Sequence, residues 1–221
     1  MGLDITVTHD VRRLIDFASE SRKQLPFATS LALNDTGFDM RNAFNKSTLS
    51  VFNKPTSFTQ KAFLTTKSKK RNLIVHVFAK DKENNDAARY LRFGVHGGAR
   101  PPKGFERYFS GLPNDGTIGP YYLPAKVKVN ASGNITKATL RKISGSIISG
   151  TSFIGTPKNS TRPPGIYERK KSKLLPKFIT TNRKPTYTGR FDLQQIGDKV
   201  VSRRFNIHLN KALDRALRTA K

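Results

Sequence analysis

The segment from Leu193 to the last residue constrains the fold more than any other, because its apolar residues recur at helical spacing. One side of the predicted helix carries Val201, Phe205, Leu209, Ala212, Leu213, Ala216, Leu217 and Ala220. The other side carries Arg204, Lys211, Arg215 and Arg218, and Asp214 is the only carboxylate from Lys199 onward. An apolar stripe of this length must pack on another element. The basic side could meet solvent, nucleic acid or an acidic neighbour.

Three further segments favour helices. Val11, Leu14, Ile15 and Ala18 predict an amphipathic helix over about 8–23. A second helix is expected over 25–44, where Pro26 suits a first helical position. A short helix is expected to open at Asn85 or Asp86, before the glycines and prolines of "HGGARPPKG" force an irregular backbone.

Strand signals surround a run of cations in the first half of the chain. "KAFLTT" and "NLIVHVFAK" read as two strands joined by a short polar segment, which predicts a hairpin at about 60–80. Its basic tip consists of Lys67, Lys69, Lys70 and Arg71. A loop-rich middle follows at about 97–160, with strand candidates at "AKVKV", "ITKATL" and "GTSFIG".

These elements predict one domain over residues 1–221 in the α+β class. We expect a small, mostly antiparallel sheet that carries the hairpin and the strands between 125 and 180. The N-terminal helices and the long C-terminal helix would pack on this sheet, and long extended loops would reach neighbouring subunits.

The charge of the chain indicates an anionic partner. Lysine and arginine number 41 against 15 aspartates and glutamates, a formal net charge of +26. Nucleic acid, an anionic membrane or an acidic protein surface would attract such a chain. No apolar run approaches the roughly 20 residues that span a bilayer, so we expect no membrane partner. The N-terminal residues lack a signal-peptide pattern, so synthesis in a cytoplasm is expected.

The residue types that carry most enzyme chemistry are sparse. The chain has no cysteine, and its four histidines (His9, His76, His96 and His208) lack metal-ligand spacing. Asp81, Glu83 and Asp86 lie close together but among cations, which favours a polar turn over a metal site. We therefore expect no enzyme, no metal and no cofactor. A nuclease that depends on Asp81 or Glu83 is the catalytic alternative.

The order of several motifs resembles a known family. "QLPFATSLALNDTGFDMR" is followed by "VFNKPTSFTQKAF", "AARYLRFGVHGGARPPKGFERYF", "PPGIYERKKSKLLPKFI" and "PTYTGRFDLQQIGDKVVSRRFNIHLNKALDRAL". This order, from about Arg22 to Arg218, resembles the tail-completion and neck proteins of tailed bacteriophages, the minor tail protein Z-like group. Tyr167 stands where tryptophan is also common in that group.

The resemblance implies a structural virion protein, made in the host cytoplasm. Such proteins form a ring, here expected to be a hexamer or dodecamer, at the head–tail junction. The ring completes the tail or joins it to the portal and its adaptor, and genomic DNA passes through it. The alternative from charge alone is a non-specific nucleic-acid-binding protein of ribosomal or packaging type.

The resemblance also indicates a subunit-interface segment. Its members are Pro163, Pro164, Gly165, Ile166, Tyr167 and Arg169. Its prolines would lower the ordering cost of docking. The competing interpretation is that Ile166 and Tyr167 fill the subunit's own core. For the cations we expect a division: the tip at 67–71 near DNA or a partner, and the C-terminal helix against a neighbour.

Overall fold

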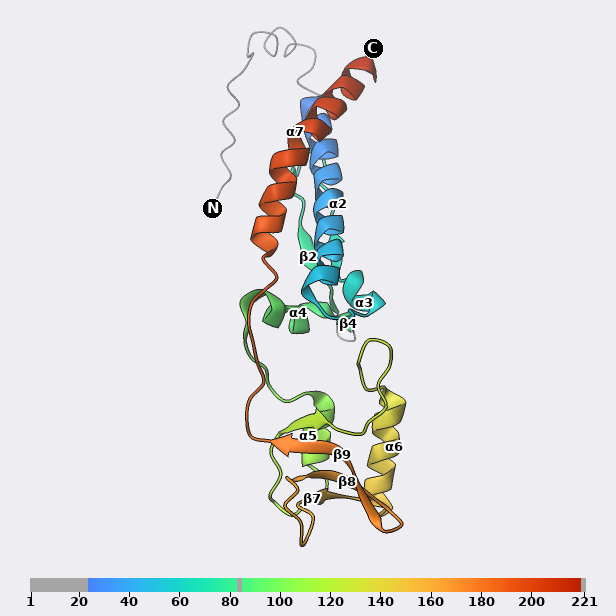
Figure 1. Ribbon diagram of the computed structural model, residues 1–221. Helices are drawn as coiled ribbons and strands as arrows, with labels where there is room; N and C mark the ends of the chain where they lie inside the picture. Colours follow the sequence, from blue (N-terminus) through green and yellow to red (C-terminus); the bar gives the residue numbers. More distant parts are fainter. Residues whose placement is uncertain (1–23, 83–84, 220–221) are drawn as a thin grey trace. The chain divides into compact units, whose positions relative to one another are not determined.

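The computed structural model describes residues 24–82 and 85–219 and has the α+β class that the sequence predicts (Figure 1). Its residues form two compact units of similar length. Unit 1 comprises Met1–Thr48, Ser57–Ala88 and Asp192–Lys221, and unit 2 comprises Leu49–Thr56 and Arg89–Phe191. Among the described residues, one cluster of buried apolar side chains lies within unit 2 and another lies within unit 1. The helix predicted over 8–23 lies outside the described residues.

Two long helices of unit 1 lie side by side and bury a seam of alanines (Figure 1). These are α2 (Leu25–Val51) and α7 (Leu193–Thr219). The seam consists of Ala28, Ala32, Ala212 and Ala216, which are at most 6% exposed. Leu31, Phe205, Leu209 and Leu213 pack around it. The apolar stripe of the C-terminal helix therefore finds its partner in α2, where the sequence analysis expects the sheet.

Replacing Ala32 with leucine is expected to lower the free energy of unfolding of unit 1 by about 1–3 kcal/mol. Ala32 is fully buried in the alanine seam, so three added carbon atoms would push α2 and α7 apart. The measurement is denaturant unfolding followed by helical circular dichroism. Ala138 is exposed on a helix of unit 2, and Ala138→Leu is the control, expected to change stability by less than 0.5 kcal/mol. Equal losses in both variants would contradict the prediction.

The predicted hairpin forms a sheet of its own in unit 1. Strand β1 (Phe63–Thr65) pairs antiparallel with β2 (Val77–Ala79). Two asparagines of α2, eleven residues apart and so on one helix face, clamp the β1 side of the hairpin. The Asn45 side chain bonds both the N–H and the carbonyl of Phe63, and Asn34 does the same for Ser68. Each amide side chain thus supplies one donor and one acceptor, the two hydrogen-bonding groups that the backbone of a neighbouring strand would otherwise provide.

Short elements complete the first half of the chain. Helix α3 covers Ser57–Gln60, and strands β3 (Asp81–Lys82) and β4 (Asn85–Asp86) form a second small antiparallel pair. Helix α4 (Ala87–His96) begins one residue after the predicted Asp86. It ends where Gly97 and Gly98 adopt positive φ angles of 70° and 98°. Strand β5 (Gly98–Ala99) then pairs with β10 (Thr186–Tyr187).

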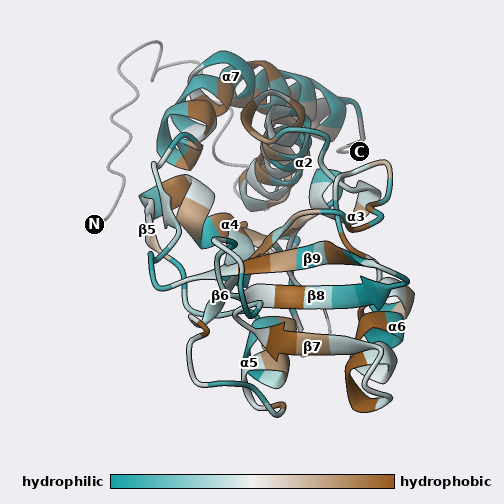
Figure 2. Cartoon of the chain, turned by 60° about the horizontal axis from the view of Figure 1, so that its bottom comes forward, coloured by the Kyte–Doolittle hydropathy of each residue, from teal (hydrophilic) through white to brown (hydrophobic). Residues whose placement is uncertain are grey.

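A four-stranded antiparallel sheet with the order β6-β9-β8-β7 forms the centre of unit 2 (Figure 2). The strands are β6 (Tyr121–Pro124), β7 (Ser152–Gly155), β8 (Gly165–Lys170) and β9 (Lys173–Thr181). Helices α5 (Gly104–Ser110) and α6 (Lys137–Ile148) contribute side chains to its core. The buried core residues are Phe109, Tyr122, Ile143, Ile154, Ile166 and Phe178.

The structure corrects two strand predictions and the composition of the sheet. "ITKATL" enters helix α6, because the Thr136 hydroxyl caps the helix by accepting from the Thr139 N–H at 3.1 Å. "AKVKV" is not a strand, although Ala125 and Lys126 still donate to the β9 carbonyls of Lys177 and Pro176. "GTSFIG" does contain β7. The hairpin at 60–80 belongs to unit 1 and is absent from the four-stranded sheet.

Candidate DNA- and partner-binding surfaces

The four cations of the first basic tip (Lys67, Lys69, Lys70 and Arg71) are all exposed at the end of the β1–β2 hairpin. A tight turn presents them, because Lys69 and Asn72 exchange two backbone hydrogen bonds of 2.9 Å. Lys70 Nζ lies 4.9 Å from the ring centroid of Phe27 on α2. This contact directs one of the four charges toward an aromatic ring of the same unit.

Exposed apolar side chains accompany this hairpin. Leu64 and Phe78 lie directly opposite each other in the β1–β2 ladder, and both are exposed. Leu73 and Ile74, just after the tip, are also exposed. We call these four residues the apolar hairpin surface. Exposed apolar clusters rimmed by charge are typical of protein-binding surfaces.

The basic face of α7 is partly engaged within unit 1. Arg204 Nε lies 3.0 Å and His208 Nε2 lies 2.8 Å from the same carboxylate oxygen of Asp39 on α2. Partial burial raises the pKa of Asp39, but the bonds to His208 and Arg204 outweigh it and hold the pKa below its ordinary value. Lys211 and Arg218 are exposed, and so is Arg215. The predicted basic face is therefore present, with Arg204 also fastening α7 to α2.

The predicted interface segment is divided between core and surface. Ile166 and Tyr167 are at most 1% exposed, so they belong to the core of their own subunit. Gly165 packs so closely on β9 that any β-carbon there would collide with the Phe178 carbonyl. Pro163 and Arg169 are exposed, and the Pro163 carbonyl accepts from the Tyr167 hydroxyl at 2.7 Å. Only the ends of the segment are thus accessible to a neighbour.

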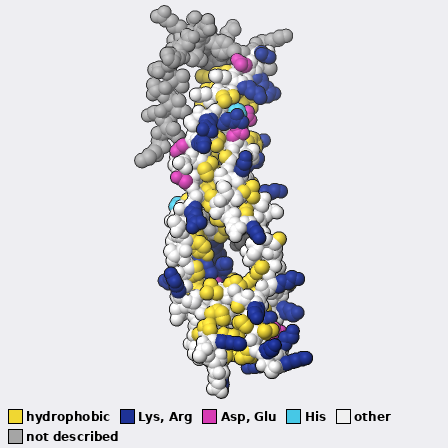
Figure 3. All heavy atoms as spheres, in the orientation of Figure 1, with side chains coloured by type: hydrophobic (Ala, Val, Ile, Leu, Met, Phe, Trp, Pro, Cys, Tyr) yellow, Lys and Arg dark blue, Asp and Glu magenta, His cyan; other side chains and the backbone are white. Residues whose placement is uncertain are grey.

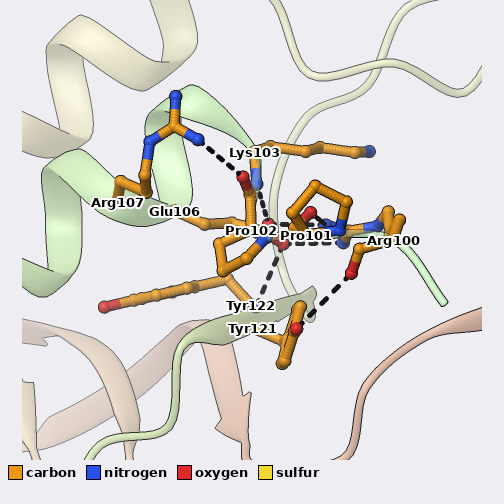
Figure 4. Close-up of polar contacts among 8 residues, drawn as sticks. All are labelled: Arg100, Pro101, Pro102, Lys103, Glu106, Arg107, Tyr121 and Tyr122. Atoms are coloured by element: carbon orange, nitrogen blue, oxygen red, sulfur yellow. Dashed lines mark hydrogen bonds and ion pairs between the residues drawn. The ribbon is translucent and has the colours of Figure 1, made fainter. Parts of the chain in front are cut away.

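Sequence reasoning missed a buried ion pair in the loop "ARPPKGFERY" (Figure 4). The Glu106 side chain is fully buried. Its two carboxylate oxygens accept hydrogen bonds from the two terminal guanidinium nitrogens of Arg100, at N–O distances of 2.7 and 2.8 Å. It also accepts from the backbone N–H groups of Lys103 and Tyr122. Burial raises the pKa of Glu106, but these four donors outweigh it and hold the pKa below its ordinary value. The pair therefore fixes the irregular loop to β6, and its role is structural.

Positive charge is concentrated in unit 2. This unit contains 21 lysines and arginines against three carboxylates, a net charge of +18, whereas unit 1 has a net charge of +8. From Gly116 to Phe191 there are 15 cations, and Glu168 is the only carboxylate. Figure 3 shows Lys and Arg side chains gathered along the side of the unit where α6 and the β8–β9 turn lie.

A second basic tip lies at the β8–β9 turn, and Arg169 is its one member among the predicted site residues. It consists of Arg169, Lys170, Lys171 and Lys173, all exposed. The sequence signal was "ERKKSK" between two strand patterns, the same pattern that predicted the first tip.

No group of three or more histidine, cysteine, aspartate or glutamate side chains gathers at metal-binding distance within residues 24–82 and 85–219. Of the proposed acidic cluster, Asp81 is exposed, Glu83 lies outside the described residues, and the structure does not describe the side chain of Asp86. In the same ranges no helix is long and apolar enough to cross a bilayer.

Comparisons with known proteins give no relative from which a function could be transferred. No protein-family model matches the chain, and no curated protein or solved structure is significantly similar to it.

Proposed function

We propose that this protein is a structural virion protein of a tailed bacteriophage that forms a ring at the head–tail junction. The observation that carries the proposal is the order of its motifs from about Arg22 to Arg218. The ring would complete the head-proximal end of the tail, or join the tail to the portal and its adaptor. Genomic DNA would pass through it, and the role is assembly rather than catalysis.

The exposed apolar residues of unit 1 support contacts with other subunits. A ring requires each subunit to present two different surfaces that meet across a heterologous interface. The apolar hairpin surface is one candidate. Ile207, which is 56% exposed on α7, marks another, since it lies off the stripe that packs on α2. Burial of these side chains between subunits would contribute about 25 cal/mol per Å² of apolar area.

The charge of unit 2 supports a polyanionic partner. DNA that slides through a ring requires many weak contacts with phosphates and none that read its sequence. The cations between Gly116 and Phe191 meet this requirement, because a single carboxylate accompanies them. The same charge favours the second candidate function, a non-specific nucleic-acid-binding protein that does not enter the virion.

The experiment that separates these functions is quantitative mass spectrometry of gradient-purified particles, with the portal protein as the internal count. A constant ratio equivalent to about six or twelve copies per particle is expected for a closed ring. Absence of the protein from mature particles would overturn the structural role and leave nucleic-acid binding as the leading function.

Charge reversal at the first basic tip is expected to impair particle assembly or DNA retention. The four substitutions Lys67→Glu, Lys69→Glu, Lys70→Glu and Arg71→Glu change exposed side chains, so folding should be unaffected. Particle yield and packaged DNA are measured in phage that carry the variant gene. Normal values for both would show that the tip contacts neither DNA nor an acidic partner.

A further inference from the structure

We propose that the second basic tip, together with Lys142 of α6, is the surface of this protein that binds the phosphate backbone of double-stranded DNA. The proposal deepens the proposed function, on which it rests for the presence of DNA, by assigning the DNA contact to particular side chains. It places this contact on unit 2 and not on the first basic tip.

The local geometry brings five cations to one end of the four-stranded sheet. The ladder pairs Glu168 with Ser152 at the start of β7, and the Ser152 hydroxyl bonds Ser146 of α6 at 2.8 Å. The β8–β9 turn continues past Glu168, so the C-terminal half of α6 and the tip share this end of the sheet. The electrostatic effect of Lys142 and Lys170 on Glu168 is consistent with this proximity.

Little negative charge competes for these cations. Glu168 is the only carboxylate from Gly116 to Phe191, and its Oε2 lies 2.6 Å from Lys177 Nζ. Lys177 therefore neutralises Glu168 and leaves Lys170, Lys171 and Lys173 available. All three are exposed, as is Lys142.

Arg169 is held in place at the base of the tip. Its guanidinium donates to the Gly150 carbonyl at 2.8 Å and lies 4.5 Å from the ring centroid of Phe153. Phe153 in turn stacks on the buried Tyr167 with a centroid distance of 5.7 Å. An arginine ordered in this way loses less conformational entropy when it meets a phosphate.

The backbone of the turn supports a functional role for its charge. Lys171 has a φ of 50°, in the left-handed region where glycine and asparagine are the favoured residues. A lysine there costs about 1 kcal/mol relative to those residues. Positive charge is therefore present at a position where local conformation alone would favour a neutral residue.

The residue types favour phosphate over an acidic protein. Lysine is depleted in protein–protein interfaces, whose centres are apolar and poor in charge. The second basic tip is rich in lysine, and the turn that carries it, from Arg169 to Lys173, contains no apolar residue. The first basic tip instead adjoins the apolar hairpin surface. A moving duplex requires several point charges without fixed register, which lysines provide.

The test uses the purified full-length chain and a 20-base-pair duplex in fluorescence anisotropy between 50 and 300 mM NaCl. The variant of the second tip carries Lys170→Gln, Lys171→Asn and Lys173→Gln, where asparagine tolerates the left-handed backbone. The matched control carries Lys67→Gln, Lys69→Gln and Lys70→Gln, which removes the same charge from the other hairpin. Lys142→Gln on α6 is a separate variant that leaves the turn intact. Thermal unfolding verifies that all variants fold.

We expect the variant of the second tip to reduce the slope of log Kobs against log[salt] by about 2–3, which at an unchanged affinity in 1 M salt lowers the affinity at 0.1 M salt by about 100- to 1,000-fold. Lys142→Gln should reduce the slope by about 1, and the matched control by less than 1. Equal losses in the two triple variants would overturn the proposal, because net charge alone would then explain binding. Equal competition by poly-glutamate at the same charge concentration would also overturn it, in favour of an acidic protein partner. Particle counts do not enter this test, so its failure is distinguishable from failure of the ring.

Discussion

Replacement of Glu106 with alanine is expected to lower the free energy of unfolding of unit 2 by about 3–5 kcal/mol. The substitution leaves the Arg100 guanidinium, whose side chain is 12% exposed, without its carboxylate. The carbonyl of Pro101 is its remaining hydrogen-bond acceptor shown in Figure 4. The backbone N–H groups of Lys103 and Tyr122 lose the acceptor that fixes the loop to the sheet.

Tyrosine fluorescence gives a selective readout of this unfolding. The six tyrosines all lie between residues 90 and 187, within unit 2, and the chain has no tryptophan. Glu168→Ala is the matched control, because it removes a carboxylate from the partly exposed pair with Lys177. That pair should contribute at most about 1 kcal/mol. A loss for Glu106→Ala no greater than the loss for the control would show that the buried pair does not stabilise unit 2.

The same carboxylate makes the stability of unit 2 depend on acid pH. The pKa of Glu106 is lower in the folded protein than the ordinary value of 4.5. Its stabilising contribution is therefore complete above that value and is lost as the pH falls through the lower, folded pKa. The free energy of unfolding is measured at pH 7 and at pH 3. It should decrease less between these two pH values in Glu106→Gln than in the natural sequence. An unchanged acid-induced loss would assign it to other carboxylates.

Phe178→Ala is expected to lower the free energy of unfolding of unit 2 by about 3–5 kcal/mol. Phe178 is fully buried on β9, and its ring lies about 6 Å, between centroids, from the rings of Phe105, Phe109 and Tyr122. Its truncation would open a cavity at the meeting point of the sheet with α5. The measurement is again denaturant unfolding followed by tyrosine fluorescence.

Phe78→Ala is the control for this variant, and its unfolding is followed by circular dichroism because Phe78 lies in unit 1, which has no tyrosine. Phe78 is 44% exposed on β2, so its truncation removes little buried area and should cost less than about 1 kcal/mol. If the two phenylalanine variants lost the same stability, the aromatic cluster would not be the centre of unit 2.

Phe78→Ala also tests the ring proposal. Loss of assembly without loss of stability in this variant would support a subunit contact at the apolar hairpin surface.

Several elements were predictable because their signals are local. The apolar stripe of α7 repeats from Val201 onward, and two short apolar runs on either side of a cationic turn predicted the β1–β2 hairpin. The basic residues of both tips likewise form runs of positive charge in the sequence. The prediction of a strand at "ITKATL" was wrong because the Thr136 side chain caps a helix there, and Leu140 and Ile143 of that helix pack in the core of unit 2.

The sequence by itself therefore determined the α+β class, the long terminal helix, the hairpin and the excess of positive charge. Only the tertiary structure decided that α7 packs on α2, that the chain divides into two units, and that Glu106 is buried while Lys171 is exposed. Periodicity and turn chemistry depend on residues that are near each other in the chain, so the amino-acid sequence shows them directly. Burial depends on which distant segments pack together, so the sequence does not show whether a glutamate is solvated or paired with a buried guanidinium.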